Sequence, residues 1–216
     1  MSDPAPPATR RSDRRLEVVA TLLLALATLA TAWAAYQSRQ WTGQQSQGYS
    51  RANASRLAVN RTSALANRQV QIDVATFLQW VDARGHHDDA LADFYRARFR
   101  DEFTPAFDAW VATRPLTNPN APATPFAMPQ YRLAATAEAD RLDAEAAAAS
   151  NQAKDANDRA NNYMLAVVLF ASALFFAGLS TKLEAPSARK AVLVLGCVLF
   201  LGTVVFLATL PIRLTN

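Results

Sequence analysis

Residues able to bind a metal ion cluster at one place in this chain. His86, His87, Asp88 and Asp89 are four consecutive residues of metal-ligand type. Neighbouring side chains on a helix point in different directions, whereas a zinc site needs three or four ligands around one ion. The sequence offers no supporting shell nearby that would orient such ligands. We therefore interpret the cluster as a solvated turn and predict no metal site.

Two pairs of acidic residues have a spacing that could serve acid–base chemistry. Asp140 and Asp143 form one pair, and Asp155 and Asp158 form the other. General acid–base catalysis needs carboxyl groups positioned against a substrate, whereas acids on an Ala-rich helix are usually surface charges. Nucleophile motifs, Gly-rich phosphate loops and dinucleotide fingerprints are absent from the sequence. We predict that the chain is not an enzyme, with no catalytic residue and no bound cofactor.

The helix expected to carry these acids has small residues at every third or fourth position. Such a seam, repeating every 3.5 residues, is typical of a coiled coil. Alanine at most seam positions would let two helix backbones approach closely, so the helix requires a partner. The seam comprises Ala135, Ala139, Leu142, Ala146, Ala149, Ala153, Ala156 and Ala160.

The same spacing identifies the partner helix in the first third of the chain. Small residues at these positions favour close packing both in lipid and in water. The pattern predicts one rod from about residue 16 to residue 82, antiparallel to the Ala-rich helix. Its packing seam includes Ala27, Thr31, Ala34, Ala52, Val59 and Ala66.

Three apolar runs predict an all-α membrane protein. They cover residues 16–35, 163–180 and 191–212, each near the ~20 residues that a spanning helix needs. Span one could instead be a signal peptide, because Ala32-Trp33-Ala34 resembles a cleavage site. Trp33 is bulky for such a site, and the packing seam continues through it. We therefore expect the segment to remain as a transmembrane helix.

Charge asymmetry predicts the orientation of these spans. Basic residues concentrate just before span one and in the loop at residues 181–190, and such flanks stay cytoplasmic. We expect a disordered basic tail at residues 1–15 in the cytosol of a bacterium. Residues 36–162 would then form a periplasmic helical hairpin, and residues 213–216 an outer tail. The basic pI of 9.6 thus reflects topology in the inner membrane, and we predict no nucleic-acid partner.

Aromatic residues predict a compact cap over about residues 70–130. Gly85 is a plausible helix stop, Asp88 or Asp89 a cap for the next helix, and Thr104 a cap for another that begins at Pro105. Residues 114–130 are rich in proline and predict an extended linker over the cap. The cap residues are Phe77, Trp80, Phe94, Tyr95, Phe99, Phe103, Phe107 and Trp110.

The two closing spans carry a family resemblance. Asn161–Leu183 and Val194–Pro211 resemble the corresponding segments of an uncharacterised bacterial three-span membrane protein family, a domain of unknown function. The resemblance covers roughly the last quarter of the chain, and the rest matches in layout alone. It implies a helical hairpin outside the membrane between the first and second spans. It implies no activity.

Three functions fit this sequence. The first is an interaction or scaffold protein that binds sibling copies or partner subunits through the hairpin. The second is a homo-oligomeric channel lined by Thr21, Thr28 and Thr31. The third is a sensor of small periplasmic ligands, although its cytosolic parts are short for signalling. We predict the first, with membrane lipid and other subunits, including sibling copies in a homo-oligomer, as partners.

Overall fold

The computed structural model describes residues 7–213, and all its regular elements are helices. This confirms the predicted all-helical class. The elements in chain order are α1 (Pro7–Gly85), α2 (Asp89–Arg96), α3 (Thr104–Ala112), the 3₁₀ helix η1 (Pro125–Ala127), α4 (Ala134–Ser180) and α5 (Pro186–Ala208).

Three of these helices are long and apolar enough to cross a membrane. They are α1, α4 and α5, and each contains a window of high mean hydropathy. Their outward side chains include Leu22, Leu29, Phe175 and Val205, all well exposed. Lipid satisfies such side chains, so the chain has the composition of a multi-pass membrane protein.

The chain divides into two compact units. The first contains the chain up to Ser50 and again from Ser150, and the second is Arg51–Ala149. Helices α1 and α4 contribute residues to both. We call them the span unit and the polar unit and describe each by itself.

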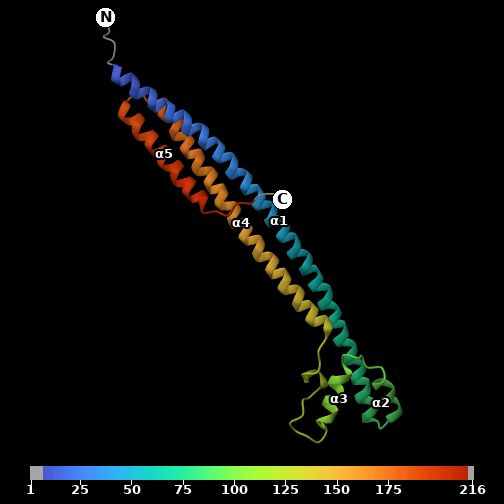
Figure 1. The fold of residues 1–216 in the computed structure, drawn as a ribbon. Helices are drawn as coiled ribbons and strands as arrows, with labels where there is room; N and C mark the ends of the chain where they lie inside the picture. The colour runs from blue at the N-terminus through green and yellow to red at the C-terminus, as the bar shows by residue number, and fades with distance from the viewer. Residues whose placement is uncertain (1–6, 214–216) are drawn as a thin grey trace. The chain divides into compact units, whose positions relative to one another are not determined.

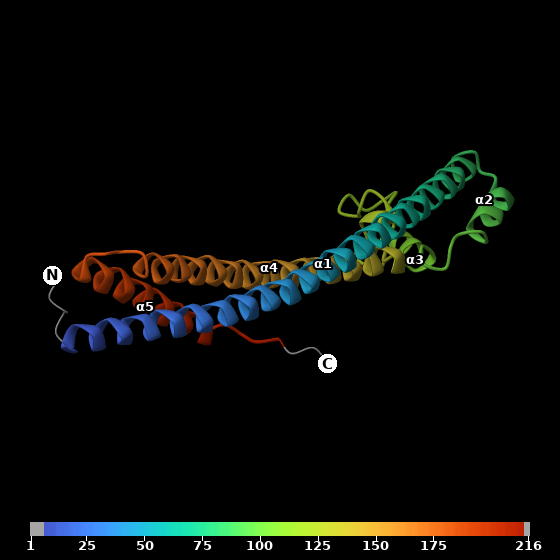
Figure 2. The same ribbon diagram turned by 90° about the horizontal axis from the view of Figure 1, so that it is seen from above.

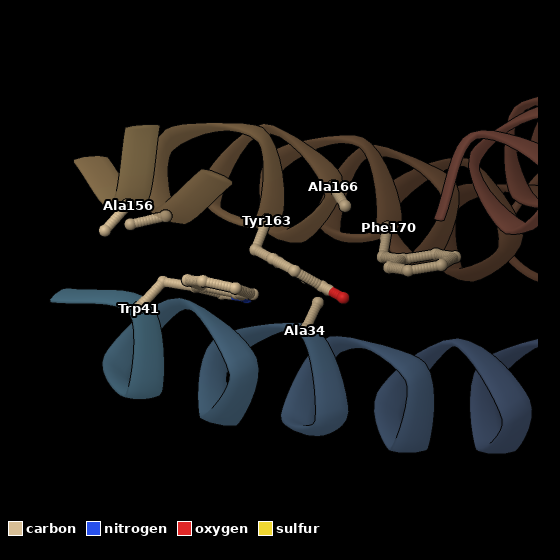
Figure 3. Packing of buried hydrophobic residues seen from close by; sticks show 7 residues of the cluster. Ala34, Trp41, Ala156, Tyr163, Ala166 and Phe170 are labelled. Carbon is tan, nitrogen blue, oxygen red and sulfur yellow. The ribbon is translucent and has the colours of Figure 1, made fainter. Parts of the chain in front are cut away.

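In the span unit, helices α1, α4 and α5 lie side by side (Figure 1 and Figure 2). Tyr163 of α4 is fully buried, and its ring enters the space between Trp41 and Ala34 of α1 (Figure 3). The hydroxyl of Ser38 donates to the carbonyl of Ala160 at 3.1 Å. The Ser38 side chain can reach the backbone of α4 because Ser38 and Ala160 are both small.

Helix α5 closes the span unit against both long helices. Leu193 packs with Ala20 and Ala177, all three buried. Further along, the rings of Phe170 and Phe200 lie 5.6 Å apart between their centroids. Leu193 of α5 packs with Ala177 of α4, and the later residue Phe200 packs with the earlier residue Phe170. The two helices therefore run antiparallel.

Several helix ends differ from the sequence-based expectation. Helix α1 begins at Pro7, within the segment expected to be disordered; Pro is favoured at a first helical position, and residues 1–6 lie outside the described range. Helix α5 ends at Ala208, where the Thr209 hydroxyl donates to the Phe206 carbonyl and Pro211 cannot continue the ladder. At α3 the cap residue is Phe103, because Thr104 is already helical and donates back to Arg100.

The contact between α5 and α4 yields a test at two glycines of α5. A Cβ atom at Gly196 would lie 3.4 Å from the Ala173 carbonyl oxygen and the Phe176 Cβ, whereas one at Gly202 would meet nothing within 4 Å. We expect Gly196→Leu to force the helices apart and cost about 1–3 kcal/mol, the usual range for overpacking. Gly202→Leu is the matched control. The melting temperature in detergent should therefore fall for Gly196→Leu alone. Equal melting temperatures of the two variants would refute this packing.

Candidate functional site

The predicted seam residues all lie on inward or partly covered faces. Ala34, Ala156 and Ala160 belong to one buried cluster in the span unit, and Ala66 and Ala135 belong to one in the polar unit. Thr31, Val59, Leu142 and Ala149 are partly buried. The remaining members are buried: Ala27, Ala52, Ala139, Ala146 and Ala153.

Six of the eight predicted cap residues meet in one aromatic cluster of the polar unit. Phe77 of α1 lies at its centre, with its ring centroid 5.4 Å from that of Trp110 and 5.6 Å from that of Phe126 in edge-to-face contacts. Edge-to-face pairs add favourable energy to the burial itself. The indole Nε1 of Trp110 donates to the Pro122 carbonyl at 2.7 Å, which fastens the proline-rich segment to the cluster. The cluster comprises Phe77, Trp80, Phe99, Phe103, Phe107, Trp110, Phe126, Met128 and Tyr131.

Phe94 and Tyr95 lie outside this cluster. They contact each other edge to face at 5.7 Å, and Phe94 is about half exposed beneath the Arg98 guanidinium. Helix α2 buries Ala92 instead. Aromatic type alone therefore grouped these two residues with the six that form the cluster, whereas the buried side of α2 is the one that carries Ala92.

A fully buried carboxylate lies beside the aromatic cluster. Asp73 of α1 accepts through Oδ2 from the Arg100 guanidinium at 2.9 Å and from the Tyr131 hydroxyl at 3.0 Å. Arg100 also forms an ion pair with Glu102. Glu102 in turn accepts from the backbone N–H of Ala134, the first residue of α4. One polar network thus joins α1, the segment before α3 and the start of α4.

Burial raises the pKa of Asp73 above its ordinary value of 3.8, against the opposing effects of Tyr131 and Arg100. Its second oxygen, Oδ1, is buried and receives no hydrogen bond from residues 14–213. The same holds for the Gln69 amide oxygen one helical turn earlier. Two buried acceptor oxygens on adjacent turns of α1 are thus without a donor among the described side chains.

Asp73 was missed in the sequence, although a signal for it exists. The four-three spacing continues past Ala66 through Val70, Asp73 and Phe77. An ionisable residue on a packing face is buried and must therefore be paired. Its partners Arg100 and Tyr131 have no such periodicity, so only the structure identifies them.

A second set of polar contacts fixes the end of α5 in the span unit. The buried Gln37 amide brackets the backbone of Arg213, with its Nε2 donating to the carbonyl and its Oε1 accepting from the N–H, both at 3.1 Å. The Tyr163 hydroxyl donates to the Pro211 carbonyl. The guanidinium groups of Arg159 and Arg213 lie 4.6 and 5.9 Å from the Trp41 ring centroid. These contacts satisfy backbone groups beyond the last turn of α5.

The other candidate residues take structural or surface positions. Asp88 caps α2 by accepting from the Leu91 N–H at 2.9 Å, and Asp89 pairs with Arg84. Among the side chains of residues 14–213, no three His, Cys, Asp or Glu come together as a metal site would require. The acids Asp140, Asp143, Asp155 and Asp158 are exposed. The hydroxyls of Thr21, Thr28 and Thr31 each donate to a carbonyl four residues earlier in their own helix.

These features define an all-helical chain with three candidate membrane spans and a polar unit built around a buried carboxylate and an aromatic cluster. Searches of protein-family models, of curated proteins and of solved structures give no match to this chain.

The buried carboxylate generates a stability prediction for the polar unit. Asp73→Ala leaves Arg100 and the Tyr131 hydroxyl without their shared acceptor, and breaking a buried pair costs about 3–5 kcal/mol. We expect about 3 kcal/mol here, because the Arg100 side chain is 22% exposed. Asp82→Ala, at an exposed position of the same helix, is the control. Limited proteolysis should cleave the first variant within residues 97–133 much faster than the control; equal rates would contradict this role.

Proposed function

We propose that this chain is a non-enzymatic interaction or scaffold protein of a bacterial inner membrane. In this proposal α1 and α4 form an Ala-rich, coiled-coil-like hairpin outside the membrane, which binds sibling copies or partner subunits. One observation carries the proposal: α1 presents a row of exposed aliphatic residues in the polar unit. Leu57 is 53% exposed, and Leu65 and Ile72 are each 47% exposed.

The exposed aliphatic residues lie on one side of α1, opposite the buried seam. Steps of eight and seven residues place Leu57, Leu65 and Ile72 on one side of the helix, within about 80° at 100° per residue. The buried seam residues Ala52, Val59 and Ala66 lie on the other side. Single exposed aliphatic residues are common on proteins, whereas a row of them on one helix face is typical of a contact surface.

The surroundings of the row favour a protein partner over lipid. Arg61 and Arg68 lie between its members and are exposed. Arginines at this spacing would be costly within the hydrocarbon core of a membrane. The row therefore belongs in water, where burying it against another protein surface releases free energy.

The proposed function predicts self-association that depends on this row. We expect purified wild-type protein in mild detergent to give oligomers by native mass spectrometry. The double variant Leu65→Asp/Ile72→Asp should shift the population to monomer with unchanged helix content, because carboxylates cannot be buried unpaired. Leu116→Asp, at a position 99% exposed in the linker, is the control. A wild-type protein that is monomeric and captures no partner by crosslinking in membranes would refute the proposal.

The proposed topology predicts which positions react with a membrane-impermeant thiol reagent. The background is Cys197→Ser, since Cys197 is the single cysteine of the chain. Leu116→Cys should react from the periplasm, whereas Ser187→Cys, in the exposed first turn of α5, should react only after the membrane is broken. The basic flanks around the spans set this order. The reverse pattern of labelling would invert the orientation.

A further inference from the structure

The polar unit carries opposite charges on its two long helices. From Arg51 to Gln71, α1 contains four arginines and no acidic residue. From Ala134 to Ala149, α4 contains four acidic residues, Glu138, Asp140, Asp143 and Glu145, against the single Arg141. Charges distributed in this way usually meet across the contact between two neighbouring helices.

In this protein the two sets do not meet. Arg141 pairs with Glu138 and Glu145 on its own helix. Asp140 and Asp143 are exposed, and neither forms an ion pair with a side chain of residues 14–213. The same is true of the α1 arginines at positions 51, 56, 61 and 68. Each helix thus presents an uncompensated charge to its surroundings.

The helical repeat places two of these arginines, Arg61 and Arg68, on one outward face of α1, and two of the acids, Asp140 and Asp143, on one outward face of α4. The basic face of α1 lies within about 80° around the helix and the acidic face of α4 within about 100°, at 100° per residue. Both point away from the alanine contacts within the polar unit. The basic face comprises Leu57, Arg61, Leu65, Arg68 and Ile72; the acidic face comprises Thr136, Asp140, Asp143, Ala144 and Ala147.

The two faces are complementary in size as well as in charge. The basic face carries bulky aliphatic side chains between its arginines, and the acidic face carries small residues between its carboxylates. Leucine side chains pack into the spaces that alanines leave on a facing helix. Arginine and carboxylate groups at the rim determine the choice of partner and its orientation more than the affinity.

We propose that the basic face of α1 binds the acidic face of α4 in a second copy of this chain. This inference rests on the self-association proposed above and names the surfaces that mediate it. Because the two faces differ, the contact is heterologous: each copy uses its basic face toward one neighbour and its acidic face toward another. A heterologous contact of this kind generates a ring where its rotation closes and a filament where it does not.

Charge reversal tests this pairing directly. Arg61→Glu/Arg68→Glu places like charges on both faces, as does Asp140→Arg/Asp143→Arg. We expect each double variant to lower the association constant at least tenfold. Combining all four changes in one chain restores opposite charges, so the oligomer should return to within about threefold of the wild-type association constant. Arg98→Glu/Arg132→Glu, exposed and outside both faces, is the control and should associate as the wild type does.

Disulfide crosslinking on the Cys197→Ser background tests which faces of two copies lie next to each other. Arg61→Cys and Asp140→Cys chains should crosslink when mixed, and neither should crosslink efficiently with itself. Efficient crosslinking of Arg61→Cys with itself would show a symmetric α1 contact and overturn the inference.

The outcomes distinguish this inference from the proposed function. A monomeric wild type overturns both. An oligomeric wild type that tolerates both double variants, or whose oligomer is not recovered by the four combined changes, overturns the pairing and leaves self-association through another surface. If Arg61→Glu/Arg68→Glu leaves the oligomer intact but abolishes binding to a different protein, the basic face binds that protein. This result too would overturn the pairing.

Discussion

The close approach of α1 and α4 is the constraint on which the rest of this structure depends. Ser38 reaches the backbone carbonyl of Ala160 because both of these residues have small side chains. An alanine seam buries less apolar area than a leucine seam would. It allows the two helix backbones to lie closer together. That exchange is favourable in lipid, where burial of apolar area drives little and shape complementarity drives association. The same seam then serves residues in both units of the chain.

The spacing of buried residues along α4 illustrates this dual use. It alternates between four and three through the alanines up to Ala160 and again from Ala166 to Ser180. At Tyr163 two successive steps of three occur, so the phase of the seam shifts once. That shift coincides with the largest fully buried side chain of the protein. A single extra step of three residues is the kind of interruption that locally overwinds a pair of packed helices.

Buried polar groups determine the register of the packed helices, which the small residues alone do not specify. An alanine seam can slide by one heptad at little cost, because its members are nearly alike. Asp73 in the polar unit and Gln37 in the span unit each hold a particular backbone or side-chain partner, so a shifted register would leave them unpaired. Single polar residues in apolar seams specify register in this way at some cost in stability. The raised pKa of Asp73 is the sign of that cost.

Features that many residues repeat could be predicted from the sequence, whereas contacts made by single residues could not. Hydrophobic periodicity identified the long helices and the three spans, since many residues repeat the same signal. The placement of Phe94 outside the aromatic cluster depends on the face that α2 turns inward, and eight residues are too few to define that face by pattern. Gln37 and Arg213 are 176 positions apart and belong to no motif.

The charge distribution in the polar unit has a physical cost that the proposed assembly would explain. Rows of like charge along a helix repel one another and lower helix stability. The cost could be avoided by exchanging a few arginines and carboxylates between α1 and α4. Arg141 demonstrates that local compensation is available on α4, where it bridges Glu138 and Glu145. Arg61 and Arg68 have no such neighbour, and they alternate with aliphatic residues that water does not favour. In the proposed contact, both costs would be removed together by an acidic surface with small side chains, such as the one that Asp140, Asp143 and the adjoining alanines form.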